Sequence, residues 1–209
     1  MKESYLTISN SKEVLLVVKR SKFIGNLKNV CSKEQAKEFI SYIKNKYKDA
    51  THNVAAYSIF SGNLKYFSDD KEPHGTAGKP VLEVLTKSNI FDVCAVVTRY
   101  FGGVLLGTGG LSFSYSSCCK KALKEATIVR CCFCVVLDVV VEYKYLSRLE
   151  NIFRMYGVKK LKELFLDKVC LNIVVEEKKF EKFKKAVLDA TNGETTFVLK
   201  KTSWESLHV

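Results

Sequence analysis

Five of the eleven glycines in this 209-residue chain fall within nine positions, inside the segment 99–110. The segment follows residues 93–97, a continuously apolar run that predicts a central strand buried on both faces. It precedes a predicted helix that runs to about Ala126 and carries Leu111 and Tyr115 on its apolar face. Because glycine permits positive φ and close backbone approach, we expect a tight connection between the strand and the helix.

Other local patterns predict the elements that come before this connection. The spacing of Ser32-Lys33-Glu34-Gln35 is typical of a capping box and predicts the start of a helix. We expect, in chain order, a pair of strands within residues 14–30, this helix, a hairpin over residues 53–67, a polar loop over 68–79 and a helix from about Pro80.

The second half of the chain follows a different order of elements. Its apolar periodicity predicts a strand, a helix, two strands, a helix and a last strand, which is the split βαβ or ferredoxin-like order. The predicted ranges are a strand over 131–141, a helix around 146–156, strands near 158–166 and 168–175, a helix around 180–190 and a strand over 195–200. The sequence therefore predicts an α+β protein with one domain over residues 1–126 and a second over 127–209.

The charge distribution indicates an anionic partner. The chain has 34 Lys and Arg against 22 Asp and Glu, a net charge of +12. Residues 1–126 hold 19 bases and 11 acids, which is +8, and residues 127–209 hold 15 and 11, which is +4. The chain contains no apolar run of about 18 residues and no apolar signal core near its first residues, so we expect a cytoplasmic protein without a membrane span.

The eight cysteines do not form a convincing metal-ligand pattern. Cys131 and Cys134 have CxxC spacing, but a zinc site normally needs a second such pair. We interpret the clustered cysteines as small apolar core residues and expect neither a metal nor a cofactor.

The glycine-rich connection could bind an anion. Free amides and a positive dipole lie at a helix N-terminus, so phosphate binding there is one reading, and a purely structural tight turn is the other. The residues concerned are Gly102, Gly103, Gly107, Thr108, Gly109 and Gly110. They match neither a Walker A loop nor a dinucleotide fingerprint.

Three residues at the end of the predicted central strand suit single-stranded RNA. Arg99 could contact phosphate, as could Lys79, while Tyr100 and Phe101 could stack on bases. In the alternative reading both aromatic rings belong to the core and Arg99 pairs with an acid such as Asp69 or Asp70.

An acidic loop and a single histidine form the remaining candidate site. Acid–base or metal chemistry is one reading of the loop, and turn residues that bind their own backbone are the other. The loop residues concerned are Asp69, Asp70, Glu72, His74, Gly75, Thr76 and Gly78. His52 could act as a base or could satisfy a structural hydrogen bond.

At four ordered motifs the chain resembles the Impact/YigZ family. The motifs are Arg20-Ser21-Lys22-Phe23-Ile24, Ala50-Thr51-His52-Asn53, the segment 69–80 with its Glu-Pro-His-Gly-Thr-Ala-Gly core, and the segment 99–111. The resemblance covers residues 1–126, and the second half resembles the smaller C-terminal domain of bacterial members only by element order.

The resemblance implies an N-terminal fold similar to the second domain of ribosomal protein S5. For bacterial members it also implies nucleic-acid or ribosome binding. Eukaryotic relatives regulate translation by competing for the activator of a starvation-sensing kinase, which implies a protein-interaction role as the alternative. Two residues depart from the family pattern: Lys71 stands where the family usually has glycine, and His74 where it has a small residue. If that glycine supplies positive φ, we expect this loop to turn differently.

Three functions follow as hypotheses. The first is a non-enzymatic cytosolic protein that contacts RNA or the ribosome and regulates translation. The second is a protein-interaction module with an acidic partner in translation control or stress response. The third, an enzyme acting on a phosphorylated small molecule, lacks a Walker lysine and a recognisable pair of metal-binding carboxylates.

Overall fold

The computed structural model describes residues 4–207 and divides into two compact units. One unit comprises Tyr5–Arg130, and the other is built from the chain after Arg130. The predicted boundary after residue 126 lies immediately before strand β7 (Thr127–Val141), whose first residues belong to the N-terminal unit.

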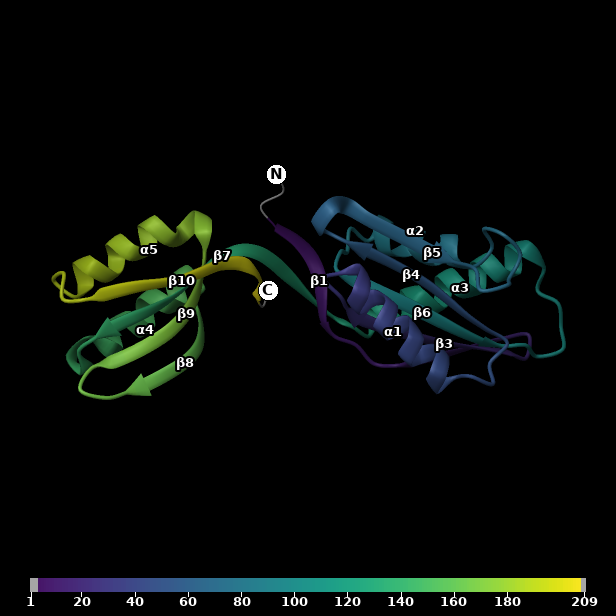
Figure 1. Cartoon of the computed structure of the whole chain (residues 1–209), viewed down its shortest axis with the longest axis horizontal. Helices are drawn as coiled ribbons and strands as arrows, with labels where there is room; N and C mark the ends of the chain where they lie inside the picture. Colours follow the sequence, from purple (N-terminus) through teal and green to yellow (C-terminus); the bar gives the residue numbers. More distant parts are fainter. Residues whose placement is uncertain (1–3, 208–209) are drawn as a thin grey trace. The chain divides into compact units, whose positions relative to one another are not determined.

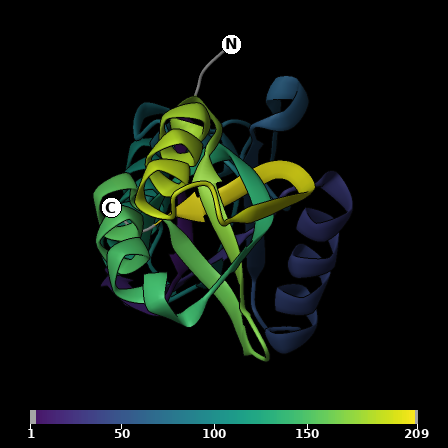
Figure 2. The same ribbon diagram turned by 90° about the vertical axis from the view of Figure 1, so that its left-hand side faces the viewer.

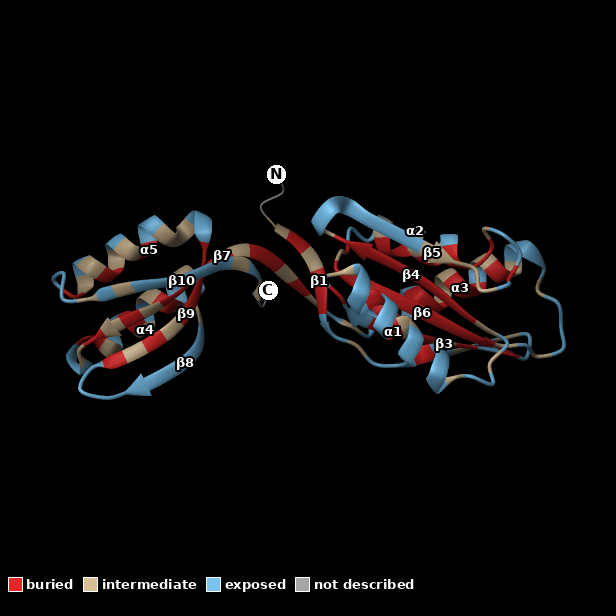
Figure 3. Cartoon of the chain, viewed as in Figure 1, coloured by how far each residue is buried: buried red, intermediate tan, exposed pale blue. Residues whose placement is uncertain are grey.

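The N-terminal unit contains a five-stranded antiparallel sheet in the order β2-β3-β6-β4-β5. Its strands are β2 (Val14–Val18), β3 (Ser21–Asn29), β4 (His52–Ile59), β5 (Leu64–Ser68) and β6 (Val93–Tyr100). The predicted central strand is confirmed, because the apolar run 93–97 lies in β6, in the middle of the sheet (Figure 3).

Three helices cover both faces of this sheet (Figure 1). They are α1 (Lys33–Lys46) on one face, and α2 (Gly78–Lys87) and α3 (Gly107–Lys124) on the other. Successive side chains of β6 point to opposite faces of the sheet. Val97 packs into the core beneath α2 and α3, and Val96 packs into the core beneath α1. This layered arrangement agrees with the fold that the family resemblance implies.

The predicted start of α1 is confirmed, with Ser32 as its N-cap. The Ser32 hydroxyl accepts a hydrogen bond from the Gln35 amide at 3.3 Å, and the Gln35 side chain accepts one from the Cys31 amide at 2.8 Å. The Ser32 bond satisfies an amide that the helix itself leaves without an acceptor, and the Gln35 side chain reaches back to the residue before the N-cap.

The C-terminal unit has the predicted ferredoxin-like order. Its elements after β7 are α4 (Leu146–Tyr156), β8 (Lys159–Phe165), β9 (Val169–Glu176), α5 (Glu177–Ala190) and β10 (Thr196–Leu207). Strand β7 pairs with β9 and β10, and β9 pairs with β8. Helices α4 and α5 lie on one face of the sheet, over a shared apolar core (Figure 2). The predicted α+β class is confirmed.

Three strands differ from the sequence-based expectation. Strand β7 begins at Thr127 instead of Cys131. The last strand continues to Leu207 instead of ending at Lys200. An unpredicted strand, β1 (Ser4–Asn10), pairs with β7 and forms a bridge from Leu6 to Ile90.

Six of the eight cysteines are buried, as the core interpretation predicts. Burial raises the pKa of the Cys94 and Cys118 thiols to about 12, so both stay protonated near neutral pH. Within residues 4–207, no group of three His, Cys, Asp or Glu residues is arranged to hold a metal ion. No helix in that range combines the length and hydropathy of a membrane span.

Candidate nucleic-acid interface

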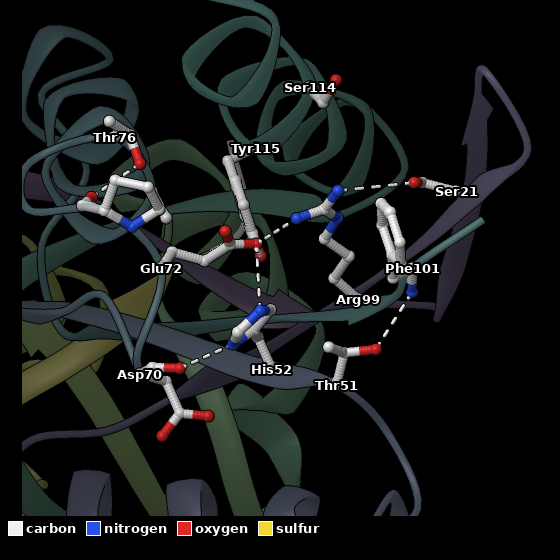
Figure 4. A network of polar contacts seen from close by, with 12 residues as sticks. Ser21, Thr51, His52, Asp70, Glu72, Thr76, Arg99, Phe101, Ser114 and Tyr115 are labelled. Carbon is white, nitrogen blue, oxygen red and sulfur yellow. Dashed lines mark hydrogen bonds and ion pairs between the residues drawn. The ribbon is translucent and has the colours of Figure 1, made fainter. Parts of the chain in front are cut away.

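A buried polar network lies at one end of the N-terminal sheet, centred on the carboxylate of Glu72 (Figure 4). The Oε1 atom of Glu72 lies 2.6 Å from Nη1 of Arg99 and accepts a hydrogen bond of 2.8 Å from the Tyr115 hydroxyl. Burial, and then the charge of Glu72, raises the pKa of Tyr115, so this hydroxyl remains a donor.

The guanidinium of Arg99 lies inside this network, and only 5% of the residue is exposed. It lies over the rings of Phe23 and Phe101, with distances of 5.6 and 5.4 Å to their centres. The prediction of an Arg99 phosphate contact does not fit this burial, because strand register turns the side chain towards α3. Arg99 instead forms an internal ion pair, as the alternative hypothesis stated. Its partner is Glu72, not Asp69 or Asp70.

His52 lies beside the network and makes one hydrogen bond through its ring. Its Nδ1 atom lies 2.8 Å from the carbonyl oxygen of Asp70, which can only accept, so Nδ1 donates. Its Nε2 atom lies 3.7 Å from Oε1 of Glu72. These contacts fit the hypothesis that His52 satisfies a structural hydrogen bond.

The acids of the loop mostly bind the chain's own backbone. Asp69 accepts hydrogen bonds from the amides of Gly75, Ala77 and Gly78 at 2.7 to 3.1 Å. It thereby caps α2, because the N-cap residue Ala77 has no polar side chain. The Thr76 hydroxyl donates to the Pro73 carbonyl oxygen at 2.7 Å, which tightens the same turn.

Asp70 fastens the loop to neighbouring elements. Its carboxylate accepts from the Asn53 amide at 2.7 Å and from Lys44 Nζ at 2.8 Å. Burial alone raises the pKa of the Asp70 carboxyl, but the bonds from Lys44 and Asn53 outweigh it, and the pKa lies below its usual value.

The expectation that Lys71 makes this loop turn differently is wrong. The Glu72 amide donates to the Asp69 carbonyl oxygen, and the two residues between them have positive φ, +44° at Asp70 and +73° at Lys71. Lysine therefore adopts the left-handed conformation that glycine would supply, at a cost of about 1–2 kcal/mol. His74 projects into solvent with 96% of its side chain exposed.

The glycine-rich connection packs directly on the turn between β2 and β3. A Cβ atom on Gly102 would lie 2.1 Å from the carbonyl carbon of Arg20, so only glycine allows this approach. The Gly102 amide also donates to the Ser21 hydroxyl at 3.2 Å. Further along, Gly103 and Gly107 have φ values of +80° and +71°.

That turn between β2 and β3 is itself strained. Val18 pairs with Ser21, so Lys19 and Arg20 alone make the turn, with φ values of +43° and +68°. Such turns favour Asn-Gly or Asp-Gly, so two bulky cations here are unfavourable for the backbone. Strain that the surrounding fold maintains is frequent at functional sites.

Beside the turn lies a groove of about 380 Å³, lined by Arg20, Lys22, Ile24, Tyr100 and Phe101. Phe101 is 46% exposed, and its backbone amide donates to the Thr51 hydroxyl at 3.0 Å. The Tyr100 hydroxyl donates to Asp49 at 2.9 Å. Sequence reasoning left Tyr100 and Phe101 open between a binding site and the core, and the core reading does not fit the exposure of Phe101. It quoted Arg20 and Lys22 in a family motif but did not name them as site residues. Only two residues, Lys19 and Arg20, separate the two strands, and this spacing could have identified the turn as a hairpin.

The remaining predicted residues lie on two parts of the surface. Gly107, Thr108 and Gly109 are exposed in the first turn of α3, after Leu106, an N-cap residue whose side chain has no hydrogen-bonding atom. Gly110 is half-buried beside Leu106. Lys79 does not line the groove beside the turn and instead lines a groove between α2 and α3.

Two family models match the chain. The model of the Impact N-terminal domain matches residues 19–123, and a domain of unknown function, DUF1949, matches residues 139–194. The chain is 38% identical over 197 residues to IMPACT family member YvyE of Bacillus subtilis, covering 93% of this chain and 90% of the relative. It is 32% identical over 194 residues to IMPACT family member YigZ of Escherichia coli, covering 91% and 95%.

A solved structure agrees with this relationship. A crystal structure described as a hypothetical protein superposes with a TM-score of 0.63 and 30% sequence identity, covering 96% of this chain and 99% of that chain. The matched domains and the full-length relatives lead to one conclusion: the chain is a member of the IMPACT family.

Proposed function

We propose that the protein is a cytoplasmic, non-enzymatic RNA-binding protein that contacts single-stranded RNA, free or in the ribosome, and so regulates translation. One observation carries the proposal: the groove beside the β2–β3 turn combines two cations, Arg20 and Lys22, with two aromatic rings, Tyr100 and Phe101. Basic grooves with aromatic platforms are typical of proteins that bind single strands without strict sequence preference.

Each component has a defined task in this proposal. Arg20 and Lys22 neutralise phosphates, and the half-exposed Phe101 ring stacks on a base. The buried network supports this arrangement, because Arg99 lies against the inner side of Phe101 and Thr51 holds its amide.

The same network favours binding over catalysis. Glu72 already accepts from Arg99 and Tyr115, and Asp69 already accepts three backbone amides. A general base needs access to a substrate proton, and the exposed fraction of Glu72 is small.

A second candidate function, a protein-interaction module with an acidic partner, rests on strand β8. This edge strand exposes Leu161, Leu164 and Phe165 among lysines, which is typical of a contact surface. Pull-down from lysate after nuclease treatment distinguishes the candidates, because a protein partner survives RNA removal.

Fluorescence anisotropy with a labelled single-stranded RNA of about ten nucleotides tests the main proposal. For each of Arg20→Gln and Lys22→Gln, we expect weaker binding and a salt dependence reduced by about 0.7 in logarithmic slope. Lys65→Gln is the matched control, because Lys65 is an exposed lysine on β5, at the other edge of the sheet. Affinity that does not change with salt, or equal losses for all three variants, would refute the proposal.

A further inference from the structure

We propose that the groove between α2 and α3 is a second contact for the same RNA strand, so that the binding site continues past the glycine-rich connection. This inference rests on the proposed function. The groove has a volume of about 540 Å³. Its polar and aromatic lining includes Lys79, Lys87, Lys120, Ser112, Phe113 and Ser116.

The surface of α3 is unusual for a helix that only covers a sheet. From Gly107 to Lys124 it contains no Asp or Glu, and Ser112 and Ser116 occupy half-exposed positions facing the groove. Serine is a weaker helix former than alanine, lysine or glutamate, so helix stability does not explain these residues. Both hydroxyls donate to backbone carbonyl oxygens, Ser112 to Thr76 at 3.3 Å and Ser116 to Phe113 at 3.1 Å. What α3 offers a phosphate backbone is therefore a surface without carboxylates that carries the cation of Lys120.

Phe113 supplies an aromatic platform in this groove. The residue is 67% exposed, whereas Tyr115, two positions later, is fully buried in the core. An exposed phenylalanine ring adds nothing to the core and leaves its face free for a base.

The charge of the groove favours a polyanion. Three of the described lining residues are lysines and one, Glu83, is an acid. Glu83 forms an ion pair with Lys87 at 3.1 Å, which leaves the lining with a net positive charge. An acidic peptide would share this preference for lysines, but the exposed Phe113 ring, which can stack on a base, favours a nucleic acid strand.

The chain connectivity keeps the two grooves within reach of one strand. Phe101 lines the first groove and Phe113 the second, with twelve residue steps between them, half of them in α3. At about 3.5 Å per extended residue and about 1.5 Å per helical residue, the separation of their Cα atoms stays below about 30 Å. Several nucleotides bridge such a distance. Lys22 and Tyr100 lie on the α1 side of the sheet and the second groove on the α2–α3 side, so the strand passes round the end of the sheet at Phe101.

Comparison of a short RNA of about four nucleotides with a long one of about twelve tests the inference. We expect Phe113→Ala and Lys120→Gln to weaken binding of the long RNA by about fivefold to tenfold and to leave the short RNA unaffected. Phe101→Ala should weaken both, because each RNA occupies the first groove. Lys124→Gln is the control, since Lys124 is an exposed lysine of α3 that does not line the groove.

The outcomes separate the two proposals. If Phe113→Ala and Lys120→Gln weaken the long RNA no more than Lys124→Gln does, the second contact is refuted. The proposed function still stands in that case if Arg20→Gln weakens both RNAs. Phe113→Leu, which keeps an apolar side chain but removes the ring, should behave like Phe113→Ala, and unchanged affinity would also refute stacking.

Discussion

Glu72 Oε1 and Arg99 Nη1 lie 2.6 Å apart inside the N-terminal unit, and both residues are almost completely buried. The pair joins the loop before α2 to the end of the central strand β6. The exposed residue Phe101 covers one side of the guanidinium, so the ring that we propose as a base platform packs directly on the ion pair.

Glu72→Gln should destabilise the protein strongly. Removal of the carboxylate charge leaves Arg99 buried without a counterion, which costs about 3–5 kcal/mol in comparable cases. Chemical denaturation followed by a probe in the N-terminal unit measures the free energy of unfolding. Glu83→Gln, at an exposed ion pair, should change it by less than about 1 kcal/mol. Equal effects of the two substitutions would contradict the role of the buried pair.

Lys71→Gly should stabilise the protein by about 1 kcal/mol, because glycine removes the penalty of the left-handed backbone at this position. Thermal or chemical denaturation measures the gain. Lys48→Gly is the matched control: Lys48 is also an exposed lysine in a turn, but it is not among the residues with positive φ. That variant should lose a few tenths of a kcal/mol through the added freedom of the unfolded chain. A loss of stability on Lys71→Gly would contradict the prediction.

Much of the fold could be predicted because its signals are local. The apolar run in β6, the capping box at Ser32 and the alternating elements of the second half each depend on neighbouring residues. Strand β1 was missed because its buried Thr7 reads as polar. Thr7 is satisfied by the distant groups Asn29 Nδ2 at 2.8 Å and the Asp92 carbonyl oxygen at 3.3 Å. The local pattern of apolar and polar residues cannot show hydrogen-bond partners that lie this far away in the sequence.

The site was harder to predict because its pairing is decided in three dimensions. The sequence does not distinguish which acid pairs with Arg99, because Asp69, Asp70 and Glu72 lie within four positions of one another. Asp69 instead binds the amides that start α2, and the left-handed turn at Asp70 and Lys71 directs Glu72 inward. The placement of Arg20 likewise depends on contact between its backbone and Gly102, a residue 82 positions away.

The stability of the protein should decrease in acid partly through Asp70. Its pKa in the folded protein lies below its usual value, so the carboxylate stabilises the fold above the unfolded-state pKa of about 4. This contribution disappears as the pH falls through the folded-state pKa. Asp70→Asn should therefore be less stable than the wild type at pH 7, and the difference should shrink below about pH 4. Unfolding free energies measured across this range provide the test, and a difference independent of pH would contradict it.

Gly102→Ala should disrupt the contact between the glycine-rich connection and the β2–β3 turn. The added Cβ would lie 2.1 Å from backbone carbon and 2.3 Å from backbone oxygen of Arg20, and neither atom can rotate away as a side chain does. The connection must therefore separate from the turn, which moves Phe101 away from Arg20 and opens the groove.

We expect Gly102→Ala to lower the unfolding free energy by at least about 2 kcal/mol and to weaken RNA binding in the folded fraction. Gly109→Ala is the matched control from the same segment. A Cβ there meets no atom within 4 Å, and alanine in the first turn of α3 keeps the backbone amide. That variant should be as stable as the wild type or more stable by up to about 1 kcal/mol, with RNA affinity retained. Denaturation curves and anisotropy titrations of both variants measure the two effects. If Gly102→Ala retained full stability and affinity, the close approach of the connection to Arg20 would not organise the site.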